Sequence, residues 1–212
     1  MAEPTVSVSG PAHLRRSPLH HLHDRMRSAS TPAAHLAELP FLTMVSLRVA
    51  PATAAADRIG KVLGAGLPTR CGDTASTGAR TALWLGPDEW LVTSGADDPA
   101  ALTAELHRAL ADEPGAVVDV SAHRTTLELS GRFARDVLEK GCAQDLHPRS
   151  FTAGTAVTTQ LGPVPLVLWR TEHADPAAPV YRLLPRSSFA DHLARWLLDA
   201  MGEYEDLART GE

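Results

Sequence analysis

Hydrophobic and polar residues alternate along several short segments, with the period of two that is typical of half-buried strands. The alternation is clearest where Thr43, Val45, Leu47 and Val49 are separated by Met44, Ser46 and Arg48. The pattern predicts eight strands, at residues 43–49, 81–85, 89–93, 116–120, 125–129, 155–161, 164–170 and 180–184. Gly86-Pro87-Asp88 supplies a turn, so the second and third strands are expected to form a hairpin.

Four other segments carry apolar residues at helical spacing, at about residues 53–63, 99–114, 132–140 and 188–201, and Gly115 marks the end of the second. Asp98 and Pro99 are typical of a helix start, and Ser188 with Asp191 resembles a capping box. The last helix has a long apolar stripe, made by Phe189, Leu193, Trp196, Leu197, Ala200 and Met201. This stripe must be covered by a sheet.

Strands interleaved with helices and hairpins predict an α+β fold with mixed or antiparallel sheets. The tripeptide Leu-Gly-Pro occurs at 85–87 and again at 161–163, each time between two predicted strands. The repetition suggests a β-α-β-β-α pseudo-repeat. We expect a body at 36–202 with halves at 36–121 and 122–202, and a C-terminal tail at 203–212.

Residues 1–35 are rich in Pro, Ser, Arg and His and have little apolar periodicity. They predict an N-terminal arm that is poorly ordered by itself and docks on a partner.

The composition is that of an ordinary globular protein, with 44% hydrophobic and 21% charged residues. The net charge of −5 and the wide separation of Lys61 from Lys140 argue against a nucleic-acid partner. The uncharged segment 150–169 contains glycines, prolines and threonines, which favours a hairpin over a membrane span. With no secretory leader in residues 1–10 and only Cys71 and Cys142, we expect a cytoplasmic protein without a disulfide framework, although one bridge stays open.

Four histidines near the start, His13, His20, His21 and His23, invite a metal-site interpretation. A metal site needs three or four placed ligands, and here only Asp24 lies close by. We favour a solvated or partner-facing arm.

Cys142, Asp145 and His147 contain the residue types of a thiol nucleophile and its helpers. Cys142 follows a predicted helix C-terminus, where the helix dipole disfavours a thiolate, so a packed structural cysteine is expected.

Asp119, Ser121 and His123 contain the residues of a catalytic triad, but alternate residues of one strand project in parallel and cannot make the two successive contacts. Gly64-Ala65-Gly66 follows a predicted helix rather than a strand, which argues against a dinucleotide loop. From the residues alone, no catalytic, cofactor-binding or metal-binding residue is expected.

Several segments keep a common order and spacing between residues 16 and 201: 16–19, 85–91, 117–131, 133–142, 145–148, 181–184 and 188–191. Together they resemble the gamma subunits of heterotetrameric sarcosine oxidases. More distantly, they are similar to the folate-binding fold of the glycine-cleavage T-protein, which implies an α+β body of two ferredoxin-like units. The T-protein pattern has a carboxylate pair where this chain has Gly162–Leu166, so the resemblance implies the fold and not the transferase activity.

The resemblance implies a non-catalytic gamma subunit that supports assembly of a flavoenzyme, with alpha, beta and delta subunits as partners. Such enzymes oxidise sarcosine to glycine. FAD, FMN, NAD and tetrahydrofolate are then expected on the larger subunits, and zinc on the smallest. We expect Arg16, Ser17, Pro18 and Leu19 to contact a partner, and deletion of residues 1–35 to leave the fold intact.

Two other interpretations stay open. One is a stand-alone folate-binding or aminomethyltransferase-like protein of the T-protein type. The other is an interaction protein of a complex that acts on a related methylated amine.

Overall fold

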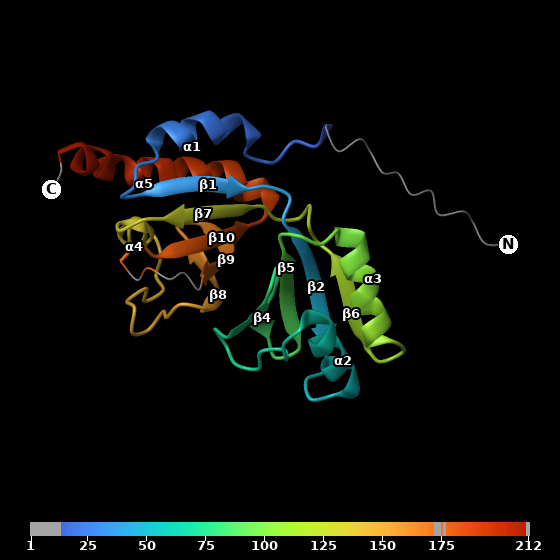
Figure 1. The fold of residues 1–212 in the computed structure, drawn as a ribbon. Coiled ribbons are helices and arrows are strands. Elements are labelled where there is room, and N and C mark those ends of the chain that lie inside the picture. Colours follow the sequence, from blue (N-terminus) through green and yellow to red (C-terminus); the bar gives the residue numbers. More distant parts are fainter. Residues whose placement is uncertain (1–13, 172–174, 176, 211–212) are drawn as a thin grey trace.

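A computed structural model describes residues 14–171, 175 and 177–210, and for 205–210 the backbone alone. The fold consists of two five-stranded antiparallel sheets with helices on their outer faces (Figure 1). Sheet A has the order β1 (His35–Leu39), β7 (Thr126–Ser130), β10 (Val180–Pro185), β9 (Val164–Arg170), β8 (Ala156–Leu161). Sheet B has the order β3 (Thr74–Thr77), β4 (Arg80–Gly86), β5 (Glu89–Ser94), β2 (Thr43–Val49), β6 (Gly115–Asp119).

Five α-helices cover these sheets: α1 (His23–Ala29), α2 (Ala54–Leu63), α3 (Pro99–Leu110), α4 (Ala134–Glu139) and α5 (Ala190–Thr210). Helices α2 and α3 share a hydrophobic core with sheet B, and α1, α4 and α5 share another with sheet A. Asp98 caps α3 by accepting a hydrogen bond from the backbone N–H of Ala101. The α+β class, the eight predicted strands and the four predicted helices are confirmed, while β1, β3 and α1 were not predicted.

The two halves repeat one topology. In each, a first strand is followed by a helix, a three-stranded meander and a second helix, and the first strand pairs with the last strand of the meander. Each repeat therefore has one strand more than the predicted β-α-β-β-α unit. The two Leu-Gly-Pro tripeptides are not equivalent, since one lies in the β4–β5 hairpin and the other in the β8–β9 hairpin.

The fifth strand of each sheet comes from a different place in the chain. Strand β6 follows α3 and pairs with β2, whereas β1 comes from the start of the chain and pairs with β7. The predicted halves 36–121 and 122–202 are therefore not the structural units, because residues 35–39 belong to the second sheet.

The N-terminal segment differs from the predicted arm. Leu19, Leu22 and Met26 are buried in the core of sheet A, and Ala33 accepts a backbone hydrogen bond from Phe133. Residues 1–13 lie outside the described residues. Because deletion of residues 1–35 would remove three core side chains, the expectation that it leaves the fold intact does not hold.

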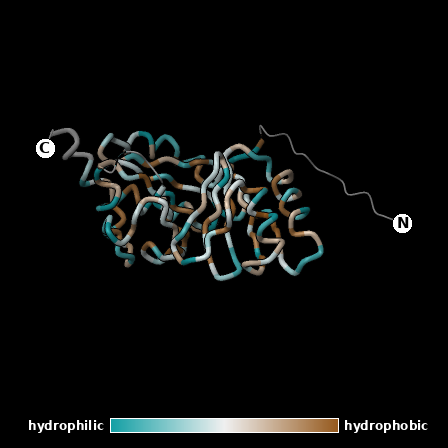
Figure 2. Tube along the Cα trace, turned by 60° about the horizontal axis from the view of Figure 1, so that its bottom comes forward, coloured by the Kyte–Doolittle hydropathy of each residue, from teal (hydrophilic) through white to brown (hydrophobic). Residues whose placement is uncertain are grey.

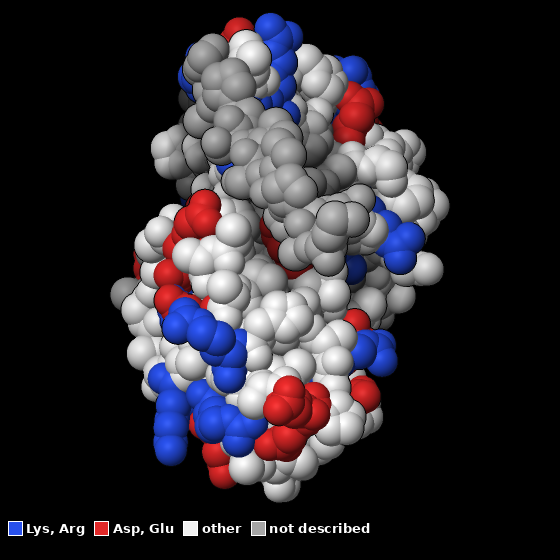
Figure 3. All heavy atoms as spheres, turned by 90° about the vertical axis from the view of Figure 1, so that its right-hand side faces the viewer, with Lys and Arg blue, Asp and Glu red and all other residues white. Residues whose placement is uncertain are grey.

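Hydropathy and charge follow this layered arrangement. Hydrophobic and hydrophilic residues alternate along the strands and helices (Figure 2). On the face that carries α3, positive and negative side chains lie interspersed among larger neutral areas (Figure 3). None of the described helices is both long and apolar enough to cross a membrane.

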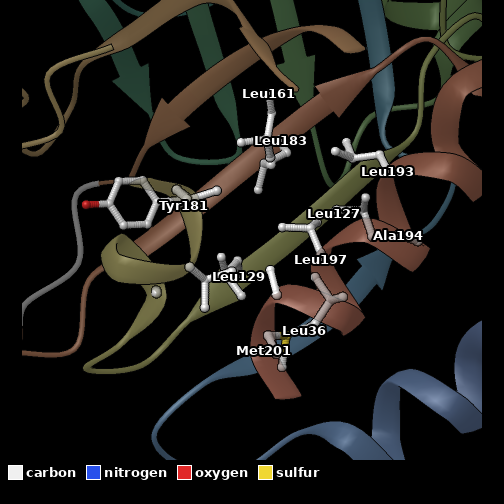
Figure 4. Close-up of a cluster of buried hydrophobic side chains, with 14 of the residues drawn as sticks. Leu36, Leu127, Leu129, Leu161, Tyr181, Leu183, Leu193, Ala194, Leu197 and Met201 are labelled. Carbon is white, nitrogen blue, oxygen red and sulfur yellow. The ribbon is translucent and has the colours of Figure 1, made fainter. Parts of the chain in front are cut away.

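The largest hydrophobic cluster lies between sheet A and α5 (Figure 4). Leu127, Leu129 and Leu183 project from the sheet toward Leu193 and Leu197 of the helix, and all five are fully buried. The predicted stripe is thus covered by the sheet at Leu193, Leu197 and Met201, whereas Phe189 lies before α5 and is 37% exposed.

A third cluster joins the two sheets. Met44, Leu83 and Leu91 of sheet B pack against a set from sheet A: Ala156, Val167, Trp169 and Leu184. Gly72 and Ala156 also form an isolated antiparallel bridge. Sheet A is consequently covered by helices on one face and, at β8, β9 and β10, by sheet B on the other.

Gly131 provides a test of how the N-terminal segment is held. Its φ is +112°, and an added Cβ would lie 2.5 Å from the carbonyl oxygen of Ala33. We expect Gly131→Ala to lower the free energy of unfolding by roughly 1–3 kcal/mol in urea titrations. Gly202→Ala is the control: it lies on α5 with open space around it and should raise stability by roughly 0.5–1 kcal/mol.

Asp97 provides a second test, in the first half. It accepts two hydrogen bonds from Arg80, at 2.8 and 2.7 Å, and one from Ser94, at 2.7 Å. These bonds, those from Arg80 first, lower the pKa of Asp97 to about 2. Since the folded-state pKa is depressed, the carboxylate stabilises the fold above its ordinary pKa of 3.8, and that contribution is lost as the pH falls toward 2.

We therefore expect Asp97→Asn to have a lower free energy of unfolding than wild type at neutral pH. This difference in stability should narrow as the pH falls from 3.8 toward 2. Urea titrations across this range measure the gap. A gap that stays constant would show that the ion pair does not contribute. Asp112→Asn, at an exposed position, should match wild type at neutral pH.

Candidate functional site

A groove of about 700 Å³ lies between the sheets, bordered by Glu128, Trp169 and Arg182. These three residues face one another across β7, β10 and β9. Arg182 forms an ion pair with Glu128 at 3.0 Å, and its guanidinium lies 5.1 Å from the centre of the Trp169 ring. The acidic and the basic side chain of this groove are therefore paired with each other.

A second hollow, of about 620 Å³, lies beside the C-terminal end of α2 and includes Gly64, Gly66 and Trp90. Gly64 ends this helix with φ +80°, and a Cβ there would lie 2.8 Å from Cγ2 of Thr77. Gly64 therefore ends the helix, in line with its predicted position after a helix rather than a strand. A helix C-terminus repels phosphate, so this hollow is unsuited to a dinucleotide.

The N-terminal histidines make separate contacts. His23 Nε2 lies 2.6 Å from Oε2 of Glu38, and His21 Nε2 lies 2.7 Å from Oδ1 of Asp191. The ring of His20 packs edge-on against that of His23. His13 lies outside the described residues, and the described part of the chain contains no group of three residues suited to hold a metal.

Glu38 is the centre of a buried polar cluster that the sequence interpretation missed. Its carboxylate accepts hydrogen bonds from Ser17 at 2.5 Å and Thr125 at 2.6 Å, in addition to the His23 contact. The sequence did contain one sign of this cluster. Leu36 and Glu38 lie on the same side of β1, so Glu38 places an acidic side chain at a core position of an alternating segment. The cluster fastens the N-terminal segment to sheet A.

The predicted interface residues fall into two groups. Arg16 and Pro18 are exposed, whereas Ser17 and Leu19 are buried. The side chains of Ser17 and Leu19 therefore point into the protein, toward Glu38 and the hydrophobic core respectively.

Cys142 packs against the core of sheet A, and its backbone N–H donates to Leu138 at the end of α4. Asp145 accepts a hydrogen bond from the backbone N–H of His147, and Nδ1 of His147 accepts one from Arg149. A hydrogen bond from Ser150, followed by that from His147, lowers the pKa of Asp145. These residues shape a turn, in line with the structural interpretation of Cys142.

Asp119 and Ser121 do meet, contrary to the parallel-projection argument, because β6 ends at Asp119. Asp119 accepts from the hydroxyl of Ser121 at 2.6 Å and from its backbone N–H at 2.9 Å. A triad requires the serine to contact the histidine instead, and the Ser121 hydroxyl is also bonded to the Met44 backbone. The pair caps the strand end.

Comparison with known proteins gives the affiliation of this chain. The model of the family described as sarcosine oxidase, gamma subunit family, matches residues 48–203. The chain belongs to this family. The sarcosine oxidase gamma subunit of Corynebacterium sp. strain P-1 is 45% identical to this family member over 193 residues, with 90% of this chain and 92% of that protein covered. The gamma subunit of an Arthrobacter species is 44% identical over the same length.

Solved structures agree with the family. A chain of the heterotetrameric sarcosine oxidase of Corynebacterium sp. U-96, solved in complex with pyrrole 2-carboxylate, superposes on this gamma-subunit family member with a TM-score of 0.83 and 41% identity. It covers 91% of this chain and 97% of that one. The glycine-cleavage aminomethyltransferase T of Bartonella henselae has a TM-score of 0.67 at 15% identity, covering 87% of this chain and 57% of the transferase, and shows the fold alone.

The Glu38 cluster generates a prediction. Ser17→Ala removes one of the donors to a buried carboxylate, so we expect it to lower the free energy of unfolding by about 1–3 kcal/mol. It should also speed trypsin cleavage at Arg25 and Arg27, which lie on the fastened segment. The exposed Ser28→Ala is the control and should behave as wild type. Equal cleavage rates in the two variants would show that the cluster does not fasten the segment.

Proposed function

We propose that this chain is a non-catalytic subunit that supports assembly of a heterotetrameric sarcosine oxidase, the flavoenzyme that oxidatively demethylates sarcosine to glycine. The observation that carries the proposal is the superposition on a chain of such an enzyme over nearly its whole length, at 41% identity. The alpha, beta and delta subunits are then its partners, and assembly takes place in the cytoplasm.

Several contacts support a role without catalysis. The acid and the base in the groove between the sheets form an ion pair with each other. The buried Glu38 is held by three side chains, and Asp119 and Ser121 shape a strand end. On this proposal FAD, FMN, NAD and tetrahydrofolate are bound by the larger subunits, with zinc on the smallest, and this chain binds none of them.

The start of the described chain stays our candidate for one partner contact. Arg16 and Pro18 are exposed beside the buried Ser17 and Leu19, so a tightly held segment presents them to the outside. A contact held in place in this way loses little conformational entropy on binding.

We also infer that each half is a ferredoxin-like unit with one added edge strand. In sheet B, the elements β2, α2, β4, β5, α3 and β6 follow one another along the chain as in a ferredoxin-like unit. Their strands lie in the order β4-β5-β2-β6, and β3 is the addition. In sheet A, strands β9, β10, β7 and β1 take the same places, with β8 added. The likeness to the T-protein fold supports this inference.

A folate-binding protein of the T-protein type is the second candidate, and titration with tetrahydrofolate separates it from the first. The β8–β9 turn and the start of β9, Gly162–Leu166, carry no acid, so we expect the isolated chain to show no tight binding of tetrahydrofolate.

The third candidate is an interaction protein of a complex that acts on a related methylated amine. The neighbouring genes test it, because such a subunit should be encoded next to a different flavoprotein.

The main prediction concerns assembly. We expect co-expression with the three neighbouring sarcosine oxidase subunits to give a four-chain complex with sarcosine-dependent peroxide production, and omission of this chain to reduce the yield of assembled flavoprotein. Gel filtration, flavin absorbance and peroxide release measure these outcomes. An active three-chain enzyme formed in full yield without this chain would contradict the proposal, as would sarcosine turnover by the isolated chain.

A further inference from the structure

The inner face of sheet B is only partly covered. Met44, Leu83 and Leu91 on this face pack against sheet A. Strand β6, at the edge of sheet B, is the strand farthest from β8 and β9 (Figure 1). The face therefore extends from the contact between the sheets toward an edge that sheet A does not reach.

The uncovered part carries an exposed apolar side chain. Val117 faces the helices and is buried, so Val118, the next residue of β6, points to the inner face, where 52% of it is exposed. Val118 pairs with Ser46 of β2, and the small side chain of Ser46 does not cover it. Val120, two residues on, packs against the cluster between the sheets, so the apolar surface continues from the core to Val118.

Two arginines lie where the chain crosses between the sheets, and one of them, Arg124, interacts electrostatically with Glu89 of β5. Arg124 and Arg186 form an isolated backbone bridge, and Nη1 of Arg124 donates to the carbonyl oxygen of Leu184 at 2.7 Å. No ion pair between described residues includes either one. Burial, followed by the like charge of Arg186, lowers the pKa of Arg124, while Glu89 offsets part of this effect.

Glu89 does not neutralise the arginine pair, because it forms an ion pair with Arg48 at 2.5 Å across β2 and β5. The face therefore combines one exposed apolar side chain with two guanidinium groups that form no ion pair with a described carboxylate. We propose that this face, with Val118 at its centre and Arg124 and Arg186 at its rim, docks a segment of a larger subunit that presents an apolar side chain beside a carboxylate. The proposal rests on the proposed function, since it assigns a partner surface within that assembly.

Charge decides among the other possible occupants. A second copy of this chain in a two-fold contact would bring the same arginine pair against itself, which is repulsive. A nucleic acid requires clustered Lys and Arg over a wide surface, which is not expected of a chain of net charge −5. An acidic, partly apolar protein segment satisfies both the guanidinium groups and Val118.

The test uses the assembled complex with two variants of this chain. Val118→Glu places a negative, solvated group in the proposed contact, and Arg186→Glu reverses the exposed member of the pair. Arg70→Glu, on a side chain that is 83% exposed in another loop and pairs with Asp73, is the control for charge reversal. We expect each of the two variants to weaken the dissociation constant for the remaining subunits by about tenfold or more, and the control to leave it within about twofold.

Salt dependence separates the two parts of the surface. The difference between Arg186→Glu and wild type should shrink at higher salt, because exposed charge pairs are screened, whereas the part of the Val118→Glu effect that comes from placing a polar group in an apolar contact should remain. Urea titration of each variant checks that the fold is retained.

The outcomes are distinguishable. Failure of the wild-type chain to associate with the other subunits would sink the proposed function. Association of all variants with wild-type affinity would overturn the docking surface alone, as would self-association of the wild-type chain that Val118→Glu abolishes.

Discussion

The burial of sheet A on both faces is the constraint on which the rest of this structure depends. Helices α1, α4 and α5 cover one face and sheet B covers the other, so side chains on both sides of its central strands contribute to a core. Without a further strand, β7 would be an open edge of this sheet. Strand β1 supplies that edge from the start of the chain, and the bonds from Ser17, His23 and Thr125 to Glu38 keep the preceding segment in place. The polar cluster is therefore part of the fold rather than of a catalytic site.

Most of the regular structure could be predicted from local pattern. Alternation and helical spacing of apolar residues both arise where one side of a strand or helix faces the core. The elements that were missed have weaker patterns. Thr74–Thr77 contains no large apolar residue, so β3 is defined only by its pairing with β4. Leu19, Leu22 and Met26 do recur at helical spacing, but arginines and histidines around them suggested an unfolded arm. The repeated tripeptide pointed to a real repeat for an invalid reason, since turn residues recur wherever a hairpin needs them.

The candidate sites could be assessed from sequence only in part. The positions of Gly64 and Cys142 relative to helix ends were correctly predicted, because a helix C-terminus is visible in the chain itself. The Asp119–Ser121 contact was not, since it depends on where the strand stops. The uncovered face around Val118 was also invisible: alternation says that Val117 and Val118 point in opposite directions, but only the packing of the two sheets decides which of them stays exposed.

The repeat explains why surface stays open at the edges of the contact between the sheets. Both sheets carry helices on their outer sides and meet through their inner sides, but they overlap through β4, β5 and the start of β2 rather than through β6. In sheet A the corresponding strand, β1, also takes no part in this contact, and the N-terminal segment closes only its outer side, with Leu36 and Glu38. On β6, the inner side keeps Val118 exposed. A doubled fold thus leaves part of a strand uncovered, and a subunit that acts through its contacts can use that surface without disturbing either core.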